Sequence, residues 1–135
     1  MSTQITRIKP LPDRLNEISG IIVDSALAIH RYYGPGLLES IYEECLIFEL
    51  TERGLIVESQ VTLPINYHDH RLKKGLKLDL LVEKSVIVEI KSVDQILTLH
   101  QSQLLTYLKI TNCRLGLVIN FNEKLIKDGI KRVVH

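Results

Sequence analysis

Two acidic residues and one lysine interrupt an otherwise apolar stretch of the sequence, namely Asp79, Glu89 and Lys91. The polar residues 83–85 divide this stretch into two short apolar runs, which predicts two strands joined by a three-residue loop. In a hairpin of that register Asp79 faces Glu89, and Lys91 points to the same face of its strand as Glu89. A two-residue loop would instead place the two carboxylates on opposite faces.

This predicted carboxylate pair indicates a site for a cation. Like charges placed directly opposite each other destabilise a sheet, and at ~4 Å two unit charges repel by about 4 kcal/mol for an effective dielectric near 20. A divalent cation shared by Asp79 and Glu89, with a lysine nearby, would offset that repulsion. Carboxylate oxygens are hard ligands that suit Mg²⁺, so the sequence predicts a Mg²⁺ or Mn²⁺ site.

A second motif, Gly36-x-x-Glu39-x-x-Tyr42, lies at the start of a predicted helix. Glu39 and Tyr42 are three residues apart and therefore share one face of that helix. A glutamate in the first turn is also favoured by the helix dipole alone, so a purely structural role for Glu39 is the alternative to a functional one.

A third motif is polar and falls on the last predicted helix. His100, Gln103 and Tyr107 are spaced by three and four residues, which places them on one face. Gln103 and Tyr107 can hydrogen-bond a phosphate, and Tyr107 can stack on a base. An ordinary solvated helix face is the alternative, and His100 is expected to have a structural role.

Apolar periodicity and turn residues predict an α/β fold with a mixed, α+β-like sheet. Asp13 is the expected N-cap of the first helix, and Leu38, Ile41, Cys45 and Phe48 form the expected core face of the second. The predicted helices span residues 13–32, 37–53 and 97–110, and the predicted strands span 55–57, 61–67, 78–82, 86–90 and 115–121. Residues 71–75 are expected to form a polar turn, and residues 130–134 an edge strand or a tail.

Length and composition indicate one globular domain, residues 1–135, in which residues 1–12 form an extended N-terminal segment. No apolar run reaches the ~18 residues of a membrane span, and the first residues lack the apolar core of a signal peptide. We therefore expect a cytoplasmic protein that does not act at a membrane. Cys45 and Cys113 stand alone, which favours free thiols over a disulfide or a metal pair.

The net charge of +1 falls short of the strongly basic character of a dedicated nucleic-acid binder but does not exclude one. Two local clusters of cations exist. Each is either a solvated face or a track for a phosphate backbone, which would give binding a steep salt dependence. The first comprises Arg71, Lys73, Lys74 and Lys77, and the second comprises Lys124, Lys127, Lys131 and Arg132.

Taken together, the motifs make the chain similar to the GxxExxY protein family, which is assigned to the PD-(D/E)XK nuclease superfamily. The similarity extends from about Leu15 to Val134. It includes Gly36, Glu39 and Tyr42, the strand from Asp79, the run Val88-Glu89-Ile90-Lys91-Ser92, and the residues His100, Gln103, Tyr107 and Gly116 to Phe121. Leu78 departs from the superfamily name, which expects proline. The resemblance implies an αβββαβ core, here preceded by an additional N-terminal helix.

The resemblance implies a metal-dependent nuclease that hydrolyses phosphodiester bonds. Its catalytic residues would be Asp79, Glu89, Lys91 and Glu39. The Mg²⁺ or Mn²⁺ ion would be held by Asp79, Glu89 and the carbonyl of Ile90, with Glu39 completing the shell through water. Gln103, Tyr107 and Tyr42 would contact the substrate. The expected partner is nucleic acid, with DNA favoured over RNA, and a homodimer is possible.

Two other functions stay open at this point. A nuclease-like fold can serve as a non-catalytic module that binds nucleic acid or a protein partner, and a small structural or dimerisation protein would have no metal affinity at all. The complete set Glu39, Asp79, Glu89 and Lys91 favours the enzyme, because a binding module does not need three acids beside a lysine.

Overall fold

The structure is a computed structural model and describes residues 9–135. The expected extended segment 1–12 therefore lies mostly outside the described residues. The helical and strand segments are α1 (Asp13–Tyr33), α2 (Glu39–Glu52), β1 (Val57–Leu63), β2 (Asn66–Tyr67), β3 (His70–Arg71), β4 (Leu76–Val82), β5 (Val86–Lys91), α3 (Thr98–Thr111), β6 (Leu115–Asn120), the short 3₁₀ helix η1 (Ile126–Gly129) and β7 (Ile130–Val134).

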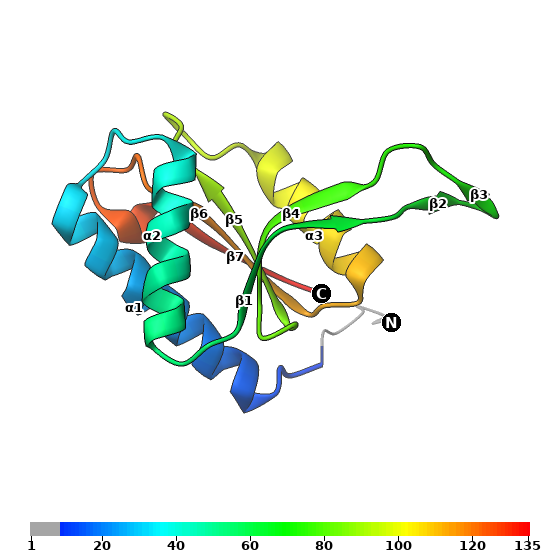
Figure 1. Cartoon of the computed structure of the whole chain (residues 1–135), viewed down its shortest axis with the longest axis horizontal. Helices are drawn as coiled ribbons and strands as arrows, with labels where there is room; N and C mark the ends of the chain where they lie inside the picture. Colours follow the sequence, from blue (N-terminus) through cyan, green and yellow to red (C-terminus); the bar gives the residue numbers. More distant parts are fainter. Residues whose placement is uncertain (1–8) are drawn as a thin grey trace, which may run out of the picture.

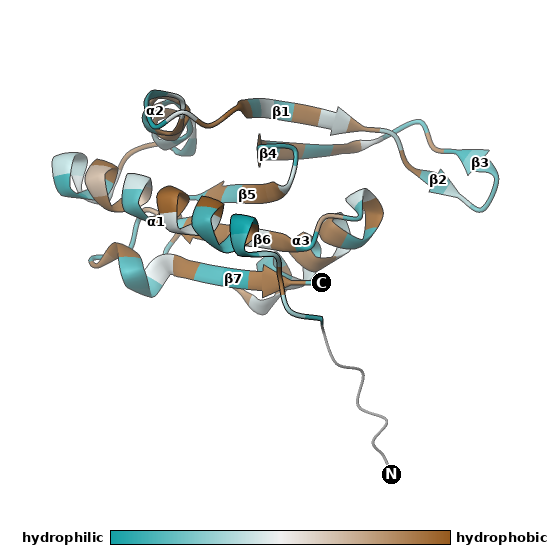
Figure 2. Cartoon of the chain, turned by 90° about the horizontal axis from the view of Figure 1, so that it is seen from below, coloured by the Kyte–Doolittle hydropathy of each residue, from teal (hydrophilic) through white to brown (hydrophobic). Residues whose placement is uncertain are grey.

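A five-stranded sheet in the order β1-β4-β5-β6-β7 forms the centre of the molecule, and Figure 2 shows these strands one above another. Only β5 and β6 run parallel, and they are the pair that α3 connects. This confirms the predicted mixed α/β fold, and residues 130–134 form the edge strand rather than a tail. None of the helices in the described part of the chain has the length and apolar character that a membrane crossing requires.

The helices cover both faces of the sheet (Figure 1). On one face α1 and α2 enclose a core with residues such as Val88 and Leu117, and on the other face α3 packs Leu104 and Leu108 against Ile87. The molecule thus has three layers, helix, sheet and helix, which is the arrangement that buries both faces of a mixed sheet.

Helix α1 buries an apolar stripe, and its start differs from the prediction. Ile18, Ile22 and Ile29 share one face at helical spacing and are buried. Pro12 precedes the helix and Asp13 is its first residue, so Asp13 contributes a negative charge to the first turn instead of capping it. The helix ends at Gly34, whose φ of 70° lies in the left-handed region that glycine adopts without strain.

The predicted core face of α2 is wrong. Leu38, Ile41 and Phe48 are exposed, and the helix buries Tyr42, Leu46 and Leu50 instead. The Tyr42 ring stacks on Phe121 of the chain after β6 with the ring centroids 4.4 Å apart. Because α2 carries apolar residues around much of its circumference, the sequence allowed two possible stripes, and this aromatic contact accompanies the one that is buried.

The β4–β5 hairpin has the predicted register. Val82 pairs with Val86 and Leu80 pairs with Val88 across the three-residue loop 83–85. In this register Asp79 and Glu89 lie at corresponding positions of the two strands.

At one position along β4, the side chains switch from one face of the sheet to the other. Residues Leu78 and Leu80 are two apart and would normally share a face, yet Leu78 packs in the core beside α3 and Leu80 in the core beside α1 and α2. Regular pairing with β1 is interrupted at the same place, between the pairs Ser59–Leu80 and Val61–Leu78. The residue skipped on β1 is Gln60, which has a φ of 51° although it is not glycine. The switch of faces therefore occurs at Asp79, between Leu78 and Leu80.

Beyond this point, the strands predicted for residues 55–57 and 61–67 are only partly correct. Strand β1 is continuous and ends before Pro64, which cannot donate a hydrogen bond to a neighbouring strand. The expected polar turn at residues 71–75 is instead part of a longer excursion, in which β2 and β3 form a small hairpin of their own. Figure 1 shows this hairpin projecting away from the body of the molecule.

Candidate active site

The two predicted carboxylates lie where β4 and β5 separate. Regular pairing of these strands ends at Leu80 and Val88. Beyond it, the Asp79 amide donates to the Glu89 carboxylate at 2.9 Å, and the Ile90 amide donates to the Asp79 carboxylate at 2.8 Å. Each side chain thus takes over a hydrogen bond of the other strand's backbone, and this exchange fixes both carboxylates in the fork between the strands.

Burial and mutual repulsion make this pair hard to ionise. Glu89 is only 8% exposed. Its burial, followed by the charge of Asp79, raises the pKa of Glu89 to about 7. Burial is also the main cause that raises the pKa of Asp79, while the Lys91 ammonium lowers the pKa of both carboxyls. Without a cation, the pair therefore tends to retain a proton near neutral pH.

Glu39 reaches this region from the first turn of α2. Its carboxylate accepts a hydrogen bond from the Ser92 amide at 3.0 Å, and the Ser92 hydroxyl donates to the Leu37 carbonyl at 2.7 Å. These two bonds join the start of α2 to the end of β5. The charge of Glu39 contributes to the raised pKa of Asp79, so Glu39 lies within electrostatic range of Asp79.

A cleft of about 270 Å³ lies between the start of α2 and the fork. Six residues line it, and they are Glu39, Ser40, Glu43, Gln60, Asp79 and Ile90. The cleft exposes carboxylates from two different elements to the same volume. Glu39 and Glu43 of α2 and Asp79 of β4 therefore border one common volume.

Two lining residues, Glu43 and Gln60, were missed by sequence reasoning. The Gln60 amide donates to the Glu43 carboxylate at 2.8 Å, and the pKa of Glu43 is raised, chiefly by burial. Glu43 follows Glu39 by one helical turn, so the i, i+4 spacing was a usable signal. Gln60 had no such signal, because its role depends on a left-handed backbone conformation that glutamine rarely adopts.

Asn120, at the end of β6, is also a positioning residue. It is fully buried, its amide donates to the Val93 carbonyl at 2.9 Å, and its carbonyl oxygen accepts from the Val93 and Asn122 amides at 3.0 and 3.2 Å. The Lys91 carbonyl accepts from the Phe121 amide at 2.9 Å. These bonds hold the chain on both sides of Ser92, next to Lys91 and Glu39.

The residues predicted to contact substrate lie in three different environments. Tyr107 is 9% exposed. Its pKa is raised by burial and then by the charges of Glu89 and Asp79, which shows that it lies near the pair. Gln103 is exposed on α3. The expectation for Tyr42 is wrong, since Tyr42 is fully buried, donates its hydroxyl to the Gly34 carbonyl at 2.6 Å and accepts from an amide of the same loop.

His100 has the structural role expected of it. Its Nδ1 accepts a hydrogen bond from the Leu97 amide at 3.0 Å at the start of α3.

The donor set of the fork suits a hard divalent cation. One oxygen each of Asp79 and Glu89 accepts a backbone amide, and the Gln60 side chain lies close enough to Asp79 to lower its pKa by hydrogen bonding. Each carboxylate has about four lone-pair sites, so these bonds leave acceptor capacity on both. Within residues 9–135, no three His, Cys, Asp or Glu side chains converge into a complete metal cage. Mg²⁺ is commonly bound by one or two carboxylates and retains several waters, so two carboxylates fit it.

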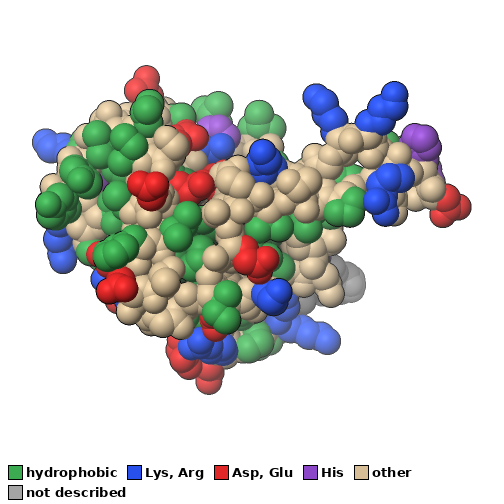
Figure 3. Space-filling view, viewed as in Figure 1, with side chains coloured by type: hydrophobic (Ala, Val, Ile, Leu, Met, Phe, Trp, Pro, Cys, Tyr) green, Lys and Arg blue, Asp and Glu red, His purple; other side chains and the backbone are tan. Residues whose placement is uncertain are grey.

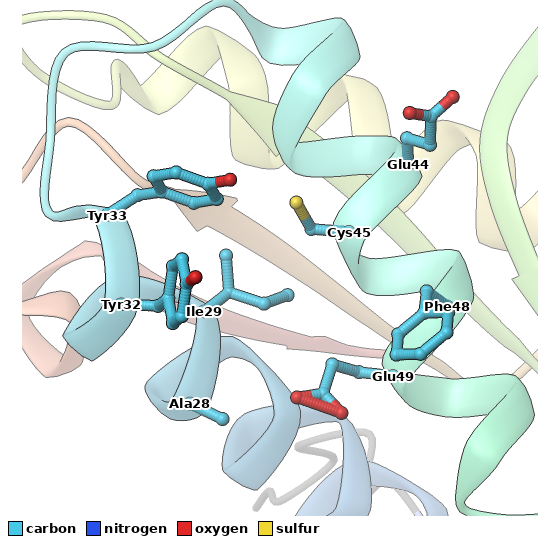
Figure 4. Close-up of a pocket in the computed structure, with 8 residues that line it drawn as sticks. All are labelled: Ala28, Ile29, Tyr32, Tyr33, Glu44, Cys45, Phe48 and Glu49. Atoms are coloured by element: carbon cyan, nitrogen blue, oxygen red, sulfur yellow. The ribbon is translucent and has the colours of Figure 1, made fainter.

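A second, larger hollow has a different character. A groove of about 380 Å³ lies between α1 and α2, where Tyr32 and Tyr33 face Cys45 and Phe48 (Figure 4). Burial and the charge of Glu44 raise the pKa of the Cys45 thiol, which keeps it protonated and unreactive. Both cysteines are free, as predicted. The Cys45 thiol in this groove is therefore not an activated nucleophile.

Comparison with known proteins gives one match. A family model described as the PD-(D/E)XK nuclease superfamily matches residues 16–133. Neither a curated protein nor a solved structure shows a significant match to the chain. The matched range contains every element from α1 to β7 except their outermost residues, and it includes Glu39, Asp79, Glu89 and Lys91.

Proposed function

The chain belongs to the PD-(D/E)XK nuclease superfamily, and from that premise we propose that it is a single-domain, metal-dependent nuclease that hydrolyses phosphodiester bonds in nucleic acid. One observation carries the proposal. The half-buried Asp79 and the buried Glu89 are held in the fork between β4 and β5 by hydrogen bonds from backbone amides, within electrostatic reach of Lys91. A nuclease-like domain that served only as a scaffold would not need this costly arrangement.

The proposed cation is Mg²⁺ or Mn²⁺. Asp79, Glu89 and the carbonyl of Ile90 would hold it, and Glu39 would complete the shell through water, because the Glu39 carboxylate is already hydrogen-bonded to Ser92. When bound, such a cation supplies Lewis-acid polarisation of a phosphoryl oxygen and makes water a better nucleophile.

Lys91 supplies the positive charge of the protein itself. Its ammonium lowers the pKa of both carboxyls, which places it within electrostatic reach of the pair. It makes no ion pair among the residues that the structure describes. We propose that Lys91 orients the attacking water and stabilises the negative charge that develops on the phosphate.

For substrate contacts we propose Tyr107, close to the pair, and Gln103, exposed on the same helix. Membership of the GxxExxY family is part of the proposal and is supported by Gly36, Glu39 and Tyr42. Tyr42 then has a structural role, since it fixes the loop from which Glu39 projects. DNA as the preferred substrate and a homodimer are further parts of the proposal.

The test is a cleavage assay on single- and double-stranded DNA and RNA with Mg²⁺ or Mn²⁺. We expect the wild type to cleave at least one of these substrates. The variants Asp79→Asn and Lys91→Ala should lose at least 100-fold in rate, in line with the loss of one electrostatic or acid–base group. Lys84→Ala is the matched control, because Lys84 is an exposed lysine in the loop of the same hairpin. Full activity in both site variants would overturn the proposal.

A non-catalytic module that binds nucleic acid or a protein is the second candidate. The observation in its favour is that Glu39 bonds to Ser92 and no third ligating side chain joins Asp79 and Glu89 in the described residues. Nucleic-acid binding with no cleavage of any substrate class under either metal would select this candidate.

A further inference from the structure

Residues 64–77, here called the basic arm, contain a long exposed segment that leaves the end of the main sheet. The arm joins β1 to β4 and contains the β2–β3 hairpin. Every residue from Asn66 to Gly75 is exposed. Figures 1 and 3 show the arm extending from the end of the sheet, with Lys, Arg and His side chains along it. Packing of a core therefore does not explain why the chain makes this excursion.

The arm holds the positive charge of the protein. It has four cations, Arg71, Lys73, Lys74 and Lys77, and a single acid, Asp69. The rest of the sequence has 13 Lys and Arg residues against 15 acids, so it is net negative while the whole chain is +1. None of the four cations is in an ion pair with a carboxylate in the described part of the chain. An anionic partner is what this uncompensated charge fits.

Specific contacts give the arm a defined shape. The Leu72 amide donates to the Ile65 carbonyl at 2.9 Å, and Nε of Arg71 donates to the Asn66 side chain at 2.7 Å, which ties the two sides of the hairpin together. At the base, Gly75 lies so close to Leu63 that a Cβ at this position would collide with the Leu63 carbonyl oxygen. The arm therefore leaves the sheet along a path that only glycine allows.

We propose that the basic arm binds the phosphate backbone of a double-stranded nucleic acid that occupies the fork. This rests on the proposed nuclease function and names the class of its substrate. At ~3.3 Å per residue, Lys77 lies about 7 Å and Arg71 at most about 26 Å from Asp79 along the strand. Fully extended, the six-residue separation from Arg71 to Lys77 would cover about 20 Å, which is long enough to cross the ~12 Å width of the major groove, a groove that admits a two-stranded ribbon. A duplex offers a phosphate charge about every 1.7 Å along that path.

A duplex fits better than a single strand. Proteins that bind single strands line a basic groove with several aromatic side chains on which successive bases stack. The arm has one tyrosine and no phenylalanine or tryptophan, and the Tyr67 ring makes an edge-to-face contact with His68 within the arm itself. Its cations are spread along an exposed ribbon and not gathered in a groove.

The test measures binding of a fluorescently labelled DNA duplex by the full chain over a range of salt concentrations, with Ca²⁺ in place of Mg²⁺. The Lys73→Ala/Lys74→Ala variant should bind more weakly and lower the slope of log K against log salt by about 1.8, at about 0.9 per phosphate. Between roughly 50 and 200 mM salt, the wild type should then lose roughly tenfold more affinity than this variant. The matched control is Lys124→Ala/Lys127→Ala, which removes two exposed lysines outside the arm and should keep the wild-type slope.

A second variant separates charge from shape. Gly75→Ala keeps every cation but must displace the base of the arm, so we expect weaker duplex binding from a variant that circular dichroism shows to be folded. If the double lysine variant keeps the wild-type affinity and slope, or if the wild type prefers the matching single strand or anionic lipid vesicles, the inference is overturned. If the wild type cleaves nucleic acid but the arm variants bind the duplex as well as the wild type does, the proposed role of the arm fails and the proposed nuclease function stands. If duplex binding depends on the arm but no substrate is cleaved, the proposed nuclease function fails and the role of the arm stands.

Discussion

Substitution of Glu89 by glutamine should make the metal-free protein more stable, although it removes a residue of the proposed active site. A shift in pKa from 4.5 to about 7 means that folding disfavours the ionised carboxyl by about 3 kcal/mol. Glutamine has no charge and can still accept the Asp79 amide hydrogen bond. We therefore expect Glu89→Gln to raise the free energy of unfolding by up to about 3 kcal/mol above pH 7.

The sign of the pH dependence follows from where the proton is bound. Between pH 4.5 and about 7, Glu89 keeps its proton in the folded chain and loses it in the unfolded chain. The folded state binds more protons there, so the stability of the wild type falls as the pH rises through this range and levels off above it. The gain from Glu89→Gln should accordingly vanish near pH 4.5.

Urea unfolding in EDTA at about pH 5 and about pH 8 measures this effect. Glu44→Gln is the matched control, because Glu44 is an exposed glutamate on α2 and its replacement should change stability little at either pH. Divalent cation should largely cancel the difference between the wild type and Glu89→Gln, since it stabilises the wild type by about 2.7 kcal/mol at 100 times its Kd and leaves the variant unchanged. A variant less stable than the wild type at the higher pH in EDTA would refute the reasoning.

Three further predictions concern the residues around the pair. Lys91→Met removes the charge that lowers the pKa of Glu89 and Asp79, so both pKa values should rise, visible as a shift to higher pH in carboxyl titration by NMR. Asn120→Ala breaks three hydrogen bonds in a fully buried position and should cost about 2–4 kcal/mol by denaturant unfolding; an unchanged midpoint would contradict its positioning role. Tyr42→Phe keeps the stacking on Phe121 but loses two hydrogen bonds of the hydroxyl, so it should cost about 1–2 kcal/mol and leave KM unchanged.

The central hairpin was predictable because its pattern is local. A three-residue polar break between two alternating apolar runs fixes which residues pair, and Leu80 and Val82 face Val88 and Val86 as expected. This register places Asp79 opposite Glu89, and the local sequence alone is enough to predict it. The order of helices and strands likewise followed from apolar periodicity and from breaks at glycine and proline.

The buried face of α2 was not predictable in the same way. Apolar residues occupy several sides of this helix, so the periodicity fits a stripe through Ile41 as well as the stripe through Leu46. The buried stripe places Tyr42 on Phe121, a residue far along the chain. Local pattern cannot choose between two stripes when a distant contact decides.

Gln60 and the basic arm show a second limit. The left-handed conformation of Gln60 is stored strain for a residue that is not glycine, and nothing nearby in the sequence calls for it. Strands β2 and β3 are only two residues each, too short to show the alternation that identifies a strand. Both features depend on how β1 and β4 pair with each other, which sequence periodicity does not contain.

The most direct test of the central claim is a calorimetric titration with Mn²⁺ and with Mg²⁺ of the wild type, Asp79→Asn and Glu89→Gln. We predict that the wild type binds the cation and that both variants lose this binding while remaining folded, because the two carboxylates act as one site. Cation binding that persists in both variants, or a wild type that binds neither cation even with a DNA duplex present, would contradict the metal site in the fork and with it the proposed nuclease.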